Sequence, residues 1–285
     1  MNSLKGTGVA LATPFDKDKS IDYSGLEKLY RHVVDGGVDY LVIMGTTGES
    51  PTVSWKEKLD VLSQIIAWNK SRLPIVFGLG GNNTEDILGK LDQIKSKKID
   101  AILSASPYYN KPTQKGIIAH YKALAGKSSF PLIVYNVPAR TASNIEAETT
   151  LELAQDTNIV AIKEASGDLS QVSRILADKE DDFMVLSGED QLSLPIISLG
   201  GEGVISVAAN AFPSEFSDMV NAAISGDIIK ARRLHLSLND YFDWLTEEGN
   251  PASLKAALES LEICGRTVRL PLAQASDQLV AKFRQ

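Results

Sequence analysis

A lysine stands near the end of an apolar segment, NIVAIKEAS, which covers residues 158–166. Side chains alternate between the two faces of a strand, so Lys163 is expected to share one face with Ile159 and Ala161. Both faces are apolar up to the lysine, a pattern typical of a strand that is covered on both sides in a parallel sheet. An amine at the carboxyl end of such a strand either extends into water or lies in a partly dry cleft. In the cleft, an unprotonated amine attacks a ketone or aldehyde to form an imine.

Polar residues also close other apolar segments. GTTGES, residues 45–50, offers backbone N–H groups and hydroxyls that can surround a small carboxylate. Tyr135 ends the segment before the lysine, where its phenol suits a proton shuttle or, alternatively, a core tyrosine with a bonded hydroxyl. Arg140 can form a bidentate pair with a carboxylate, or else a surface salt bridge. Together these side chains favour imine chemistry at Lys163.

The positions of the histidines and the cysteine argue against a metal site and against a Ser-His-Asp catalytic triad. The three histidines, His32, His120 and His235, fall within separate predicted helices, and Cys264 is the single cysteine, so a zinc site of the usual ligand type cannot be assembled. The same placement leaves a Ser-His-Asp hydrolase without a suitable histidine. A carboxylate-bound Mg²⁺ is less firmly excluded, although the segment ends offer hydroxyls and a lysine more than clustered acids. We therefore expect no metal.

Eight short apolar, β-branched segments must position these side chains. They cover residues 8–13, 39–44, 74–79, 100–105, 131–136, 158–163, 182–187 and 203–208, and segments of helical periodicity lie between them. One such helix begins after Ser54, which has capping-box spacing to Glu57. Alternating strands and helices predict a (β/α)8 TIM barrel, with its active site at the carboxyl ends of the strands. A doubly wound sheet is the alternative, but GLGGNN at residues 78–83 does not complete the GxGxxG pattern.

Strand signals stop at about Gly226. We expect a catalytic (β/α)8 barrel over residues 1–225 and a C-terminal helical domain over residues 226–285, with three helices at 227–248, 250–262 and 275–284. The aromatic residues of this domain are expected to pack against the barrel or a neighbouring subunit.

Composition narrows the class of protein and its partners. The chain has 285 residues, 44% of them hydrophobic, and a formal net charge of -7, so we expect neither nucleic acid nor an anionic membrane as a partner. No apolar stretch approaches the ~20 residues that a membrane helix needs. The start MNSLKGTG lacks the apolar core of a signal peptide. We expect a cytoplasmic enzyme.

The chain carries GTTGES, SPYYNKPTQ, YNVPARTA, AIKEASGD, LSGED and GVISVAAN in this order. With these motifs it resembles, over essentially its whole length, the pyruvate-dependent lyase and aldolase family that includes dihydrodipicolinate synthase and N-acetylneuraminate lyase, and its synthase members most closely. The resemblance implies that Lys163 is the Schiff-base lysine. It assigns the proton relay to Tyr135, Thr47 and Tyr109, the last of which would enter the site of the neighbouring subunit. The implied substrate contacts are Thr46 and Thr47 for the pyruvate carboxylate, backbone groups of Gly188 and Ile205, and Arg140 for the carboxylate of the aldehyde.

The implied reaction condenses pyruvate with L-aspartate 4-semialdehyde to 4-hydroxy-tetrahydrodipicolinate, on the route to diaminopimelate and lysine. The imine forms on the protein's own lysine, so no external cofactor is required. The family's usual assembly is a homotetramer of two tight dimers. Two alternatives stay open: a lyase of the same fold for N-acetylneuraminate or a 2-keto-3-deoxy sugar acid, and a barrel that binds a carboxylic acid without catalysis. Arg140 favours the synthase, because a polyol substrate needs hydroxyl partners where an amino-aldehyde acid needs a cation.

Regulation is the point at which the chain departs from part of the family. Lysine-inhibited synthases bind the amino acid at the dimer interface, and the matching positions here are Ser50, Pro51, Trp55, Lys58, Asn82, Asp86 and Tyr108. Lys58 stands where the inhibited enzymes typically carry histidine or glutamate, and its ammonium would face the positive groups of an incoming lysine. We therefore expect weak or absent feedback inhibition, unless Lys58 points into solvent and leaves the pocket intact.

Overall fold

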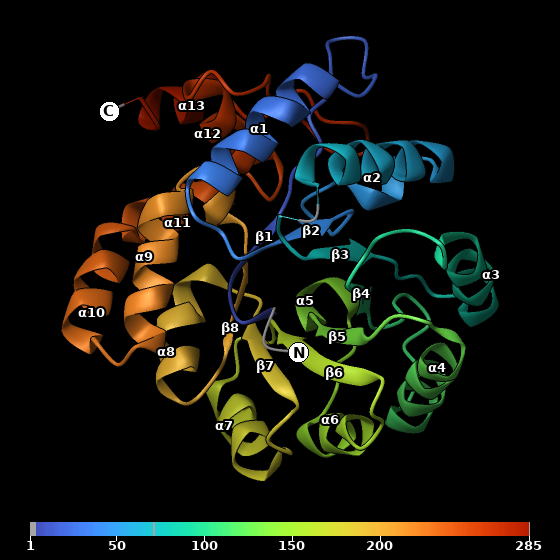
Figure 1. Cartoon of the computed structure of the whole chain (residues 1–285). Helices are drawn as coiled ribbons and strands as arrows, with labels where there is room; N and C mark the ends of the chain where they lie inside the picture. Colours follow the sequence, from blue (N-terminus) through green and yellow to red (C-terminus); the bar gives the residue numbers. More distant parts are fainter. Residues whose placement is uncertain (1–3, 71, 285) are drawn as a thin grey trace.

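The computed structural model describes residues 4–70 and 72–284. Eight parallel strands follow one another in chain order and close into a barrel, because β8 pairs with β1 (Figure 1). The strands are β1 (Gly6–Ala10), β2 (Tyr40–Ile43), β3 (Ile75–Gly78), β4 (Ala101–Ala105), β5 (Leu132–Asn136), β6 (Ile159–Glu164), β7 (Met184–Ser187) and β8 (Gly203–Ser206). The expected (β/α)8 TIM barrel is confirmed.

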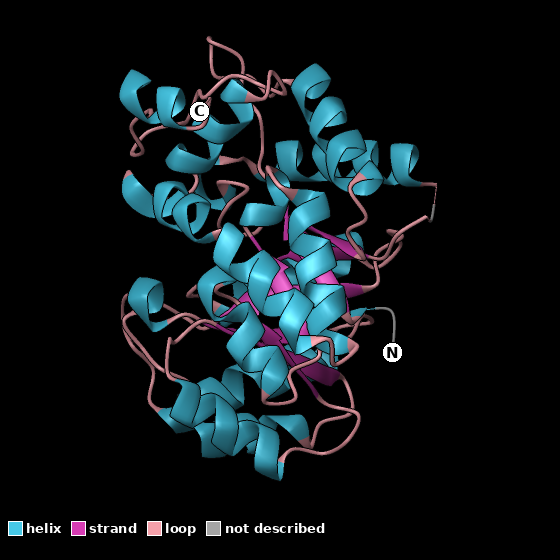
Figure 2. Ribbon diagram, turned by 90° about the vertical axis from the view of Figure 1, so that its left-hand side faces the viewer, coloured by secondary structure: helices cyan, strands magenta, loops and turns pink. Residues whose placement is uncertain are grey.

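Helices surround the strands on the outside of the barrel (Figure 2). Those that follow strands are α1 (Tyr23–Asp35), α2 (Trp55–Asn69), α3 (Thr84–Ile94), α4 (Gln114–Lys127), α5 (Pro138–Thr141), α6 (Ala147–Ala154), α7 (Leu169–Asp178), α8 (Ser193–Ser198) and α9 (Pro213–Ile224), with short 3-10 turns η2 (Ser50–Thr52), η3 (Asp190–Leu192) and η4 (Ala208–Asn210). The capping box at Ser54 and Glu57 is present as expected. Apart from the short α5, these helices bury apolar side chains against the outer faces of the strands.

The alternating side chains of the strands fill the barrel interior. This inner cluster includes Tyr40 and Val42 of β2, Leu103 of β4 and Tyr135 of β5. Space there is so tight that a Cβ at Gly8 would lie 2.2 Å from the Tyr40 ring. The interior is therefore a packed core, and side chains can reach a cavity only at its ends.

Strand bounds differ from the expectation by one to three residues, and β6 also has an irregular register. β1 begins at Gly6, two residues before the predicted start, and ends at Ala10, beyond which the Ala12 N–H donates to the Asn210 side chain (3.0 Å) and no longer to a strand. In β6 the register shifts between the pairs Leu132–Ile159 and Ile133–Ala161, so one extra residue, Val160, enters the strand. Ile159 consequently packs in the outer core, and the expectation that it shares a face with Lys163 is wrong.

Between residues 226 and 284, the C-terminal region contains four helices and not three: α10 (Ile228–Ser237), α11 (Asn239–Glu247), α12 (Ala252–Ser260) and α13 (Asp277–Lys282). The single helix predicted over 227–248 is interrupted at Leu238, the buried C-cap residue of α10, and Asp240 lies in the first turn of α11. An acidic residue in a first turn favours a new helix start. The division at residue 225 stays a prediction, and the outer ends of both expected domains, residues 1–3 and 285, lie outside the described residues.

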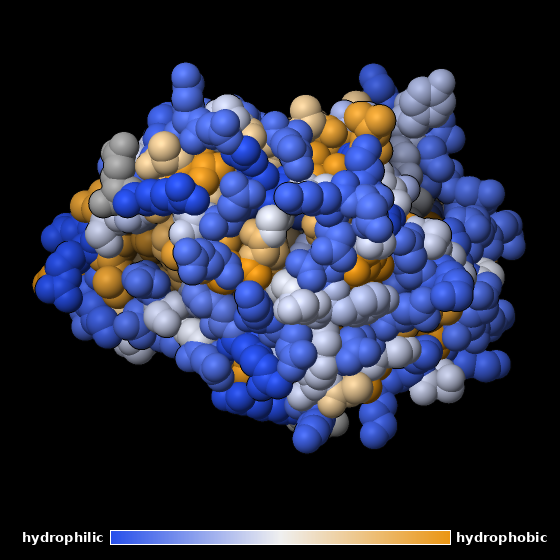
Figure 3. Space-filling view, turned by 90° about the horizontal axis from the view of Figure 1, so that it is seen from above, coloured by the Kyte–Doolittle hydropathy of each residue, from blue (hydrophilic) through white to orange (hydrophobic). Residues whose placement is uncertain are grey.

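The face of the molecule on the side of α1, α2 and the C-terminal helices is mostly hydrophilic, with hydrophobic side chains in several separate patches (Figure 3). Over residues 4–70 and 72–284, we find no helix whose length and apolar character would allow it to span a bilayer.

Candidate active site

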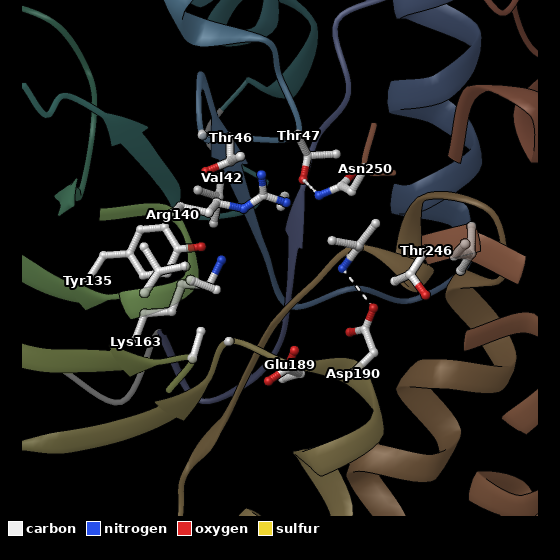
Figure 4. Close-up of a pocket in the computed structure, with 18 of the residues that line it drawn as sticks. Val42, Thr46, Thr47, Tyr135, Arg140, Lys163, Glu189, Asp190, Thr246 and Asn250 are labelled. Atoms are coloured by element: carbon white, nitrogen blue, oxygen red, sulfur yellow. Dashed lines mark hydrogen bonds between the residues drawn. The ribbon is translucent and has the colours of Figure 1, made fainter. Parts of the chain in front are cut away.

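A cavity of about 410 Å³ opens at the carboxyl ends of the barrel strands (Figure 4). Six residues singled out from the sequence line it together, and five of them were expected to act through their side chains: Thr46, Thr47, Tyr135, Arg140 and Lys163. They come from the ends of three strands, β2, β5 and β6, and from the segments that follow them. The barrel thus brings together side chains that are separated by more than a hundred residues in the sequence.

Lys163 and Tyr135 are neighbours across the β5–β6 ladder, where they form a register pair. The Lys163 side chain is 6% exposed, and its Nζ lies 4.4 Å from the centre of the Tyr135 ring. Lys163 forms no ion pair with any described residue. An amine and a phenol therefore lie side by side at the wall of the cavity, where a carbonyl compound can meet both.

The loop with Thr46 and Thr47 is held in a strained backbone. Met44 and Glu49 on its two sides have φ of 61° and 52°, the left-handed region that favours glycine. Thr47 is 2% exposed, and its Oγ1 accepts a hydrogen bond from Asn250 Nδ2 (3.2 Å). Such strain persists only where the surroundings fix the backbone, and here they fix two hydroxyls at the cavity.

A buried ion pair with the C-terminal region fixes the loop that contains Thr46 and Thr47. Glu49 Oε1 accepts a hydrogen bond from Lys255 Nζ of α12 (2.5 Å), and both side chains are 0% exposed. Lys255 also donates to the carbonyl of Thr267 (2.8 Å), and Glu49 Oε2 accepts from the backbone N–H of Arg269 (3.0 Å). Burial lowers the pKa of Lys255, whereas Glu49 acts in the opposite direction. The C-terminal region therefore supports the threonine loop directly.

Arg140 lies on the short helix α5, and a buried polar network fixes the segment that follows it. Glu164, 1% exposed, accepts hydrogen bonds from Asn136 Nδ2 (3.0 Å) and Gln171 Nε2 (3.0 Å). Asn136 Nδ2 also donates to Asn144 Oδ1 (2.8 Å). The ends of β5 and β6 are thus tied to the turn after α5, and this restricts where the guanidinium can lie.

The loop after β7 forms another wall. A Cβ at Gly188 would lie 2.7 Å from the Cβ of Ala165 and 3.1 Å from Cε of Lys163, so a larger residue would displace the lysine. Gly188 lines the cavity as expected, together with Glu189 and Asp190. Ile205, in contrast, is buried in the barrel interior and is not among the lining residues.

Tyr109 is not brought into this cavity. Its side chain is 87% exposed, and its backbone has a left-handed φ of 76°. A large aromatic side chain held outward in an unfavourable backbone conformation is consistent with a contact outside the single chain. Its entry into a neighbouring site stays a prediction.

A second cavity of about 480 Å³ lies beside the first and shares Thr46, Tyr135 and Arg140 with it. Six of the seven positions expected for lysine binding line it: Ser50, Pro51, Lys58, Asn82, Asp86 and Tyr108. The seventh, Trp55, does not, because its indole N–H donates to Gln93 Oε1 (2.8 Å) and Lys90 lies over its ring.

The sequence interpretation missed three residues that act on the site: Glu49, Asn250 and Lys255. Two signals were present. Glu49 follows the paired threonines directly, and Lys255 stands among apolar residues in SLKAALESL, where an exposed lysine is not expected. The histidines lie in α1, α4 and α10, as predicted. Among residues 4–70 and 72–284, no three His, Cys, Asp or Glu side chains gather as metal ligands do.

The sequence model of the Dihydrodipicolinate synthetase family matches residues 3–285. The chain belongs to this family. A 4-hydroxy-tetrahydrodipicolinate synthase from Flavobacterium psychrophilum is 47% identical over 98% of this chain and 96% of the relative, and one from Azobacteroides pseudotrichonymphae is 48% identical over 99% and 96%.

Solved structures of family members have the same fold. Dihydrodipicolinate synthase from Thermotoga maritima superposes with a TM-score of 0.96 at 36% identity and covers 99% of this chain and 97% of its own. A synthase from Cyanidioschyzon merolae with lysine bound has a TM-score of 0.94 at 37% identity, with 98% and 96% covered.

Proposed function

We propose that this chain is a 4-hydroxy-tetrahydrodipicolinate synthase, which condenses pyruvate with L-aspartate 4-semialdehyde through an imine on Lys163. The observation that carries the proposal is the pair of Lys163 and Tyr135 in the cavity of a chain that is 47% identical to a synthase over nearly its whole length. An amine beside a phenol is the arrangement that imine formation needs, because each step adds or removes a proton.

In the first half-reaction, neutral Lys163 adds to the ketone carbon of pyruvate. The carbinolamine loses water to give the imine, and a proton then leaves the methyl group to give an enamine. Tyr135, whose ring centre lies 4.4 Å from Lys163 Nζ, is the proposed proton carrier, and Thr47, whose hydroxyl is fixed by Asn250, is the next member of the relay. Thr46 and Thr47 would hold the pyruvate carboxylate at the loop after β2, with the backbone of Gly188 at the opposite wall.

In the second half-reaction, the enamine carbon attacks the aldehyde to form a carbon–carbon bond. Arg140 would hold the carboxylate of this second substrate. The aldehyde oxygen takes up a proton, and the ammonium group of the substrate loses one. The resulting amine attacks the imine carbon, the ring closes and Lys163 leaves. Every electron pair comes from the two substrates and the lysine, so the proposed reaction needs no external cofactor.

The proposed assembly is a homotetramer of two tight dimers in the cytoplasm, in which Tyr109 completes the proton relay of a neighbouring subunit. The outward position of Tyr109 supports this proposal, since the side chain is 87% exposed in the single chain.

Pyruvate consumption tests the function directly. The chain should consume pyruvate with aspartate semialdehyde and show no comparable consumption with N-acetylmannosamine, because Arg140 offers a cation where a sugar needs hydroxyl partners. Preferential condensation with N-acetylmannosamine would contradict the proposal and favour a sugar-acid lyase.

Replacement of Arg140 by alanine should separate the two substrates. We expect the KM for aspartate semialdehyde to rise about tenfold or more, because a charge-assisted pair is lost. Imine formation with pyruvate, measured by borohydride trapping, should be unchanged. Arg174→Ala, which removes an exposed guanidinium paired with Glu148 on the outside of the barrel, is the matched control. Equal damage to both half-reactions would mean that Arg140 acts on the structure.

The second cavity leads to a prediction about regulation. Lys58 does not point into solvent: it lines this cavity, and burial together with nearby Lys90 lowers its pKa, whereas Asp86 acts in the opposite direction. Asp86 already pairs with Lys90 at 2.5 Å. The cavity therefore presents more positive than negative side-chain charge to an incoming lysine.

We expect L-lysine to inhibit weakly or not at all. Two like charges ~4 Å apart repel by roughly 4 kcal/mol at an effective dielectric constant of 20, which offsets a modest affinity. Half-maximal inhibition by L-lysine below about 1 mM, which corresponds to roughly 4 kcal/mol of binding, would contradict this expectation. If the repulsion is the cause, Lys58→His should strengthen inhibition.

A further inference from the structure

Three charged side chains in the active-site cavity belong to neither the lysine pair nor the threonine loop: Arg140, Glu189 and Asp190. The first two reach the cavity from different walls, Arg140 from α5 and Glu189 from the loop after β7 (Figure 4). The proposed reaction gives Arg140 a partner, the carboxylate of the aldehyde substrate. It leaves Glu189 without one, although this carboxylate lines the same cavity.

The neighbouring carboxylate, Asp190, is already engaged. Its Oδ2 accepts hydrogen bonds from the backbone N–H groups of Val207 (3.1 Å) and Ala208 (2.7 Å), and it thereby joins the loops after β7 and β8. The Glu189 carboxylate, in contrast, accepts no hydrogen bond and forms no salt bridge with the part of the chain that the structure describes.

The backbone of Glu189 is nonetheless fixed. Its carbonyl accepts from the hydroxyls of Ser187 (2.8 Å) and Ser193 (3.0 Å). Burial and the nearby Asp190 raise the pKa of Glu189, and Arg140 acts in the opposite direction. Two adjacent carboxylates, one fixed and one free, make this wall a favourable place for a cation.

We propose that Glu189 binds the α-ammonium group of the aldehyde substrate while Arg140 binds its carboxylate, so that the cavity selects an amino-acid aldehyde over a plain aldehyde acid. This inference rests on the proposed function and adds a specificity-determining residue to it. In L-aspartate 4-semialdehyde the ammonium and the carboxylate are bonded to the same carbon atom, and a cation on one wall with a carboxylate on another matches such a dipolar group. Pyruvate has no positively charged group, so we expect Glu189 not to contribute to its binding.

The test compares two aldehydes that differ only in the amine. Glu189→Gln keeps the shape of the side chain and removes its charge. We expect the KM for aspartate semialdehyde to rise about tenfold or more, since a charge-assisted hydrogen bond is lost. Succinic semialdehyde, which lacks the amine, should keep its inhibition constant against the same reaction within about twofold, and borohydride trapping of pyruvate should be unchanged.

Glu180→Gln is the matched control. It removes the same charge at an exposed position before β7, at the opposite end of the barrel, and should leave all three measurements unchanged.

Equal weakening of both aldehydes by Glu189→Gln would overturn the inference, because it would mean that Glu189 only orients Arg140. An unchanged KM for aspartate semialdehyde would overturn it too. Absence of condensation in the wild type would instead refute the proposed function itself, and this result is visible before any variant is compared.

Discussion

Reduction with borohydride in the presence of pyruvate should add the reduced pyruvyl group to a peptide that contains Lys163. Lys163 is 6% exposed and lies at the carboxyl end of β6, inside the cavity that the threonine loop and Tyr135 also line. Mass spectrometry of the digested protein measures the label directly. A label on another lysine, or no label, would contradict the mechanism.

Lys163→Ala should lose activity by roughly three orders of magnitude or more, because removal of a covalent catalyst removes the intermediate itself. The variant should stay folded, since trimming a functional polar side chain often costs little stability. Lys115→Ala is the matched control, because Lys115 is an exposed lysine in the first turn of α4. Near-normal turnover by Lys163→Ala with a native unfolding curve would refute covalent catalysis.

Lys255→Met should cost about 3–5 kcal/mol of unfolding free energy, because it leaves the fully buried carboxylate of Glu49 without its cation. Denaturant unfolding measures this cost. The double variant Glu49→Gln, Lys255→Met should recover part of it, since it removes the uncompensated charge.

Lys282→Met provides the comparison for this buried pair. It breaks a pair with Glu247 whose side chains are 39% and 42% exposed, and exposed pairs contribute about 0–1 kcal/mol. If Lys255→Met were no more destabilising than Lys282→Met, the buried pair would not support the threonine loop as we infer. Where Lys255→Met still folds, slower imine formation with pyruvate would show that the loop has moved.

The barrel could be predicted from local patterns because each strand is buried on both faces and therefore reads as an apolar segment in the sequence. The same logic located Lys163 and Tyr135, which stand at the ends of such segments, and Thr47, which lies four residues beyond the end of β2. The positions of the strands and of the residues at their ends could therefore be predicted from the pattern of a few neighbouring residues.

Features that depend on distant or irregular contacts escaped this logic. The extra residue in β6 follows from its register with β5 and exchanges the faces of Ile159 and Val160 without any local signal. The break at Leu238 lies within an otherwise helical segment. Glu189 belongs to the motif LSGED, which the sequence interpretation noted without assigning a role to this residue. Its proposed role depends on Asp190, and not Glu189, accepting the hydrogen bonds from the backbone N–H groups of Val207 and Ala208, which only the folded loop shows.

The ion pair between Glu49 and Lys255 determines how late in the synthesis of the chain the active site can form. Glu49 leaves the ribosome early, and its cation, Lys255, follows 206 residues later. Until Lys255 is present, burial of the Glu49 carboxylate is unfavourable because its charge is unpaired. The loop with Thr46 and Thr47 then lacks the contact that stabilises the left-handed backbone at Glu49. A nascent or truncated chain that contains Lys163 but not Lys255 should therefore be unable to bind pyruvate. The Lys163 amine should react with pyruvate only after nearly the whole chain has been synthesised.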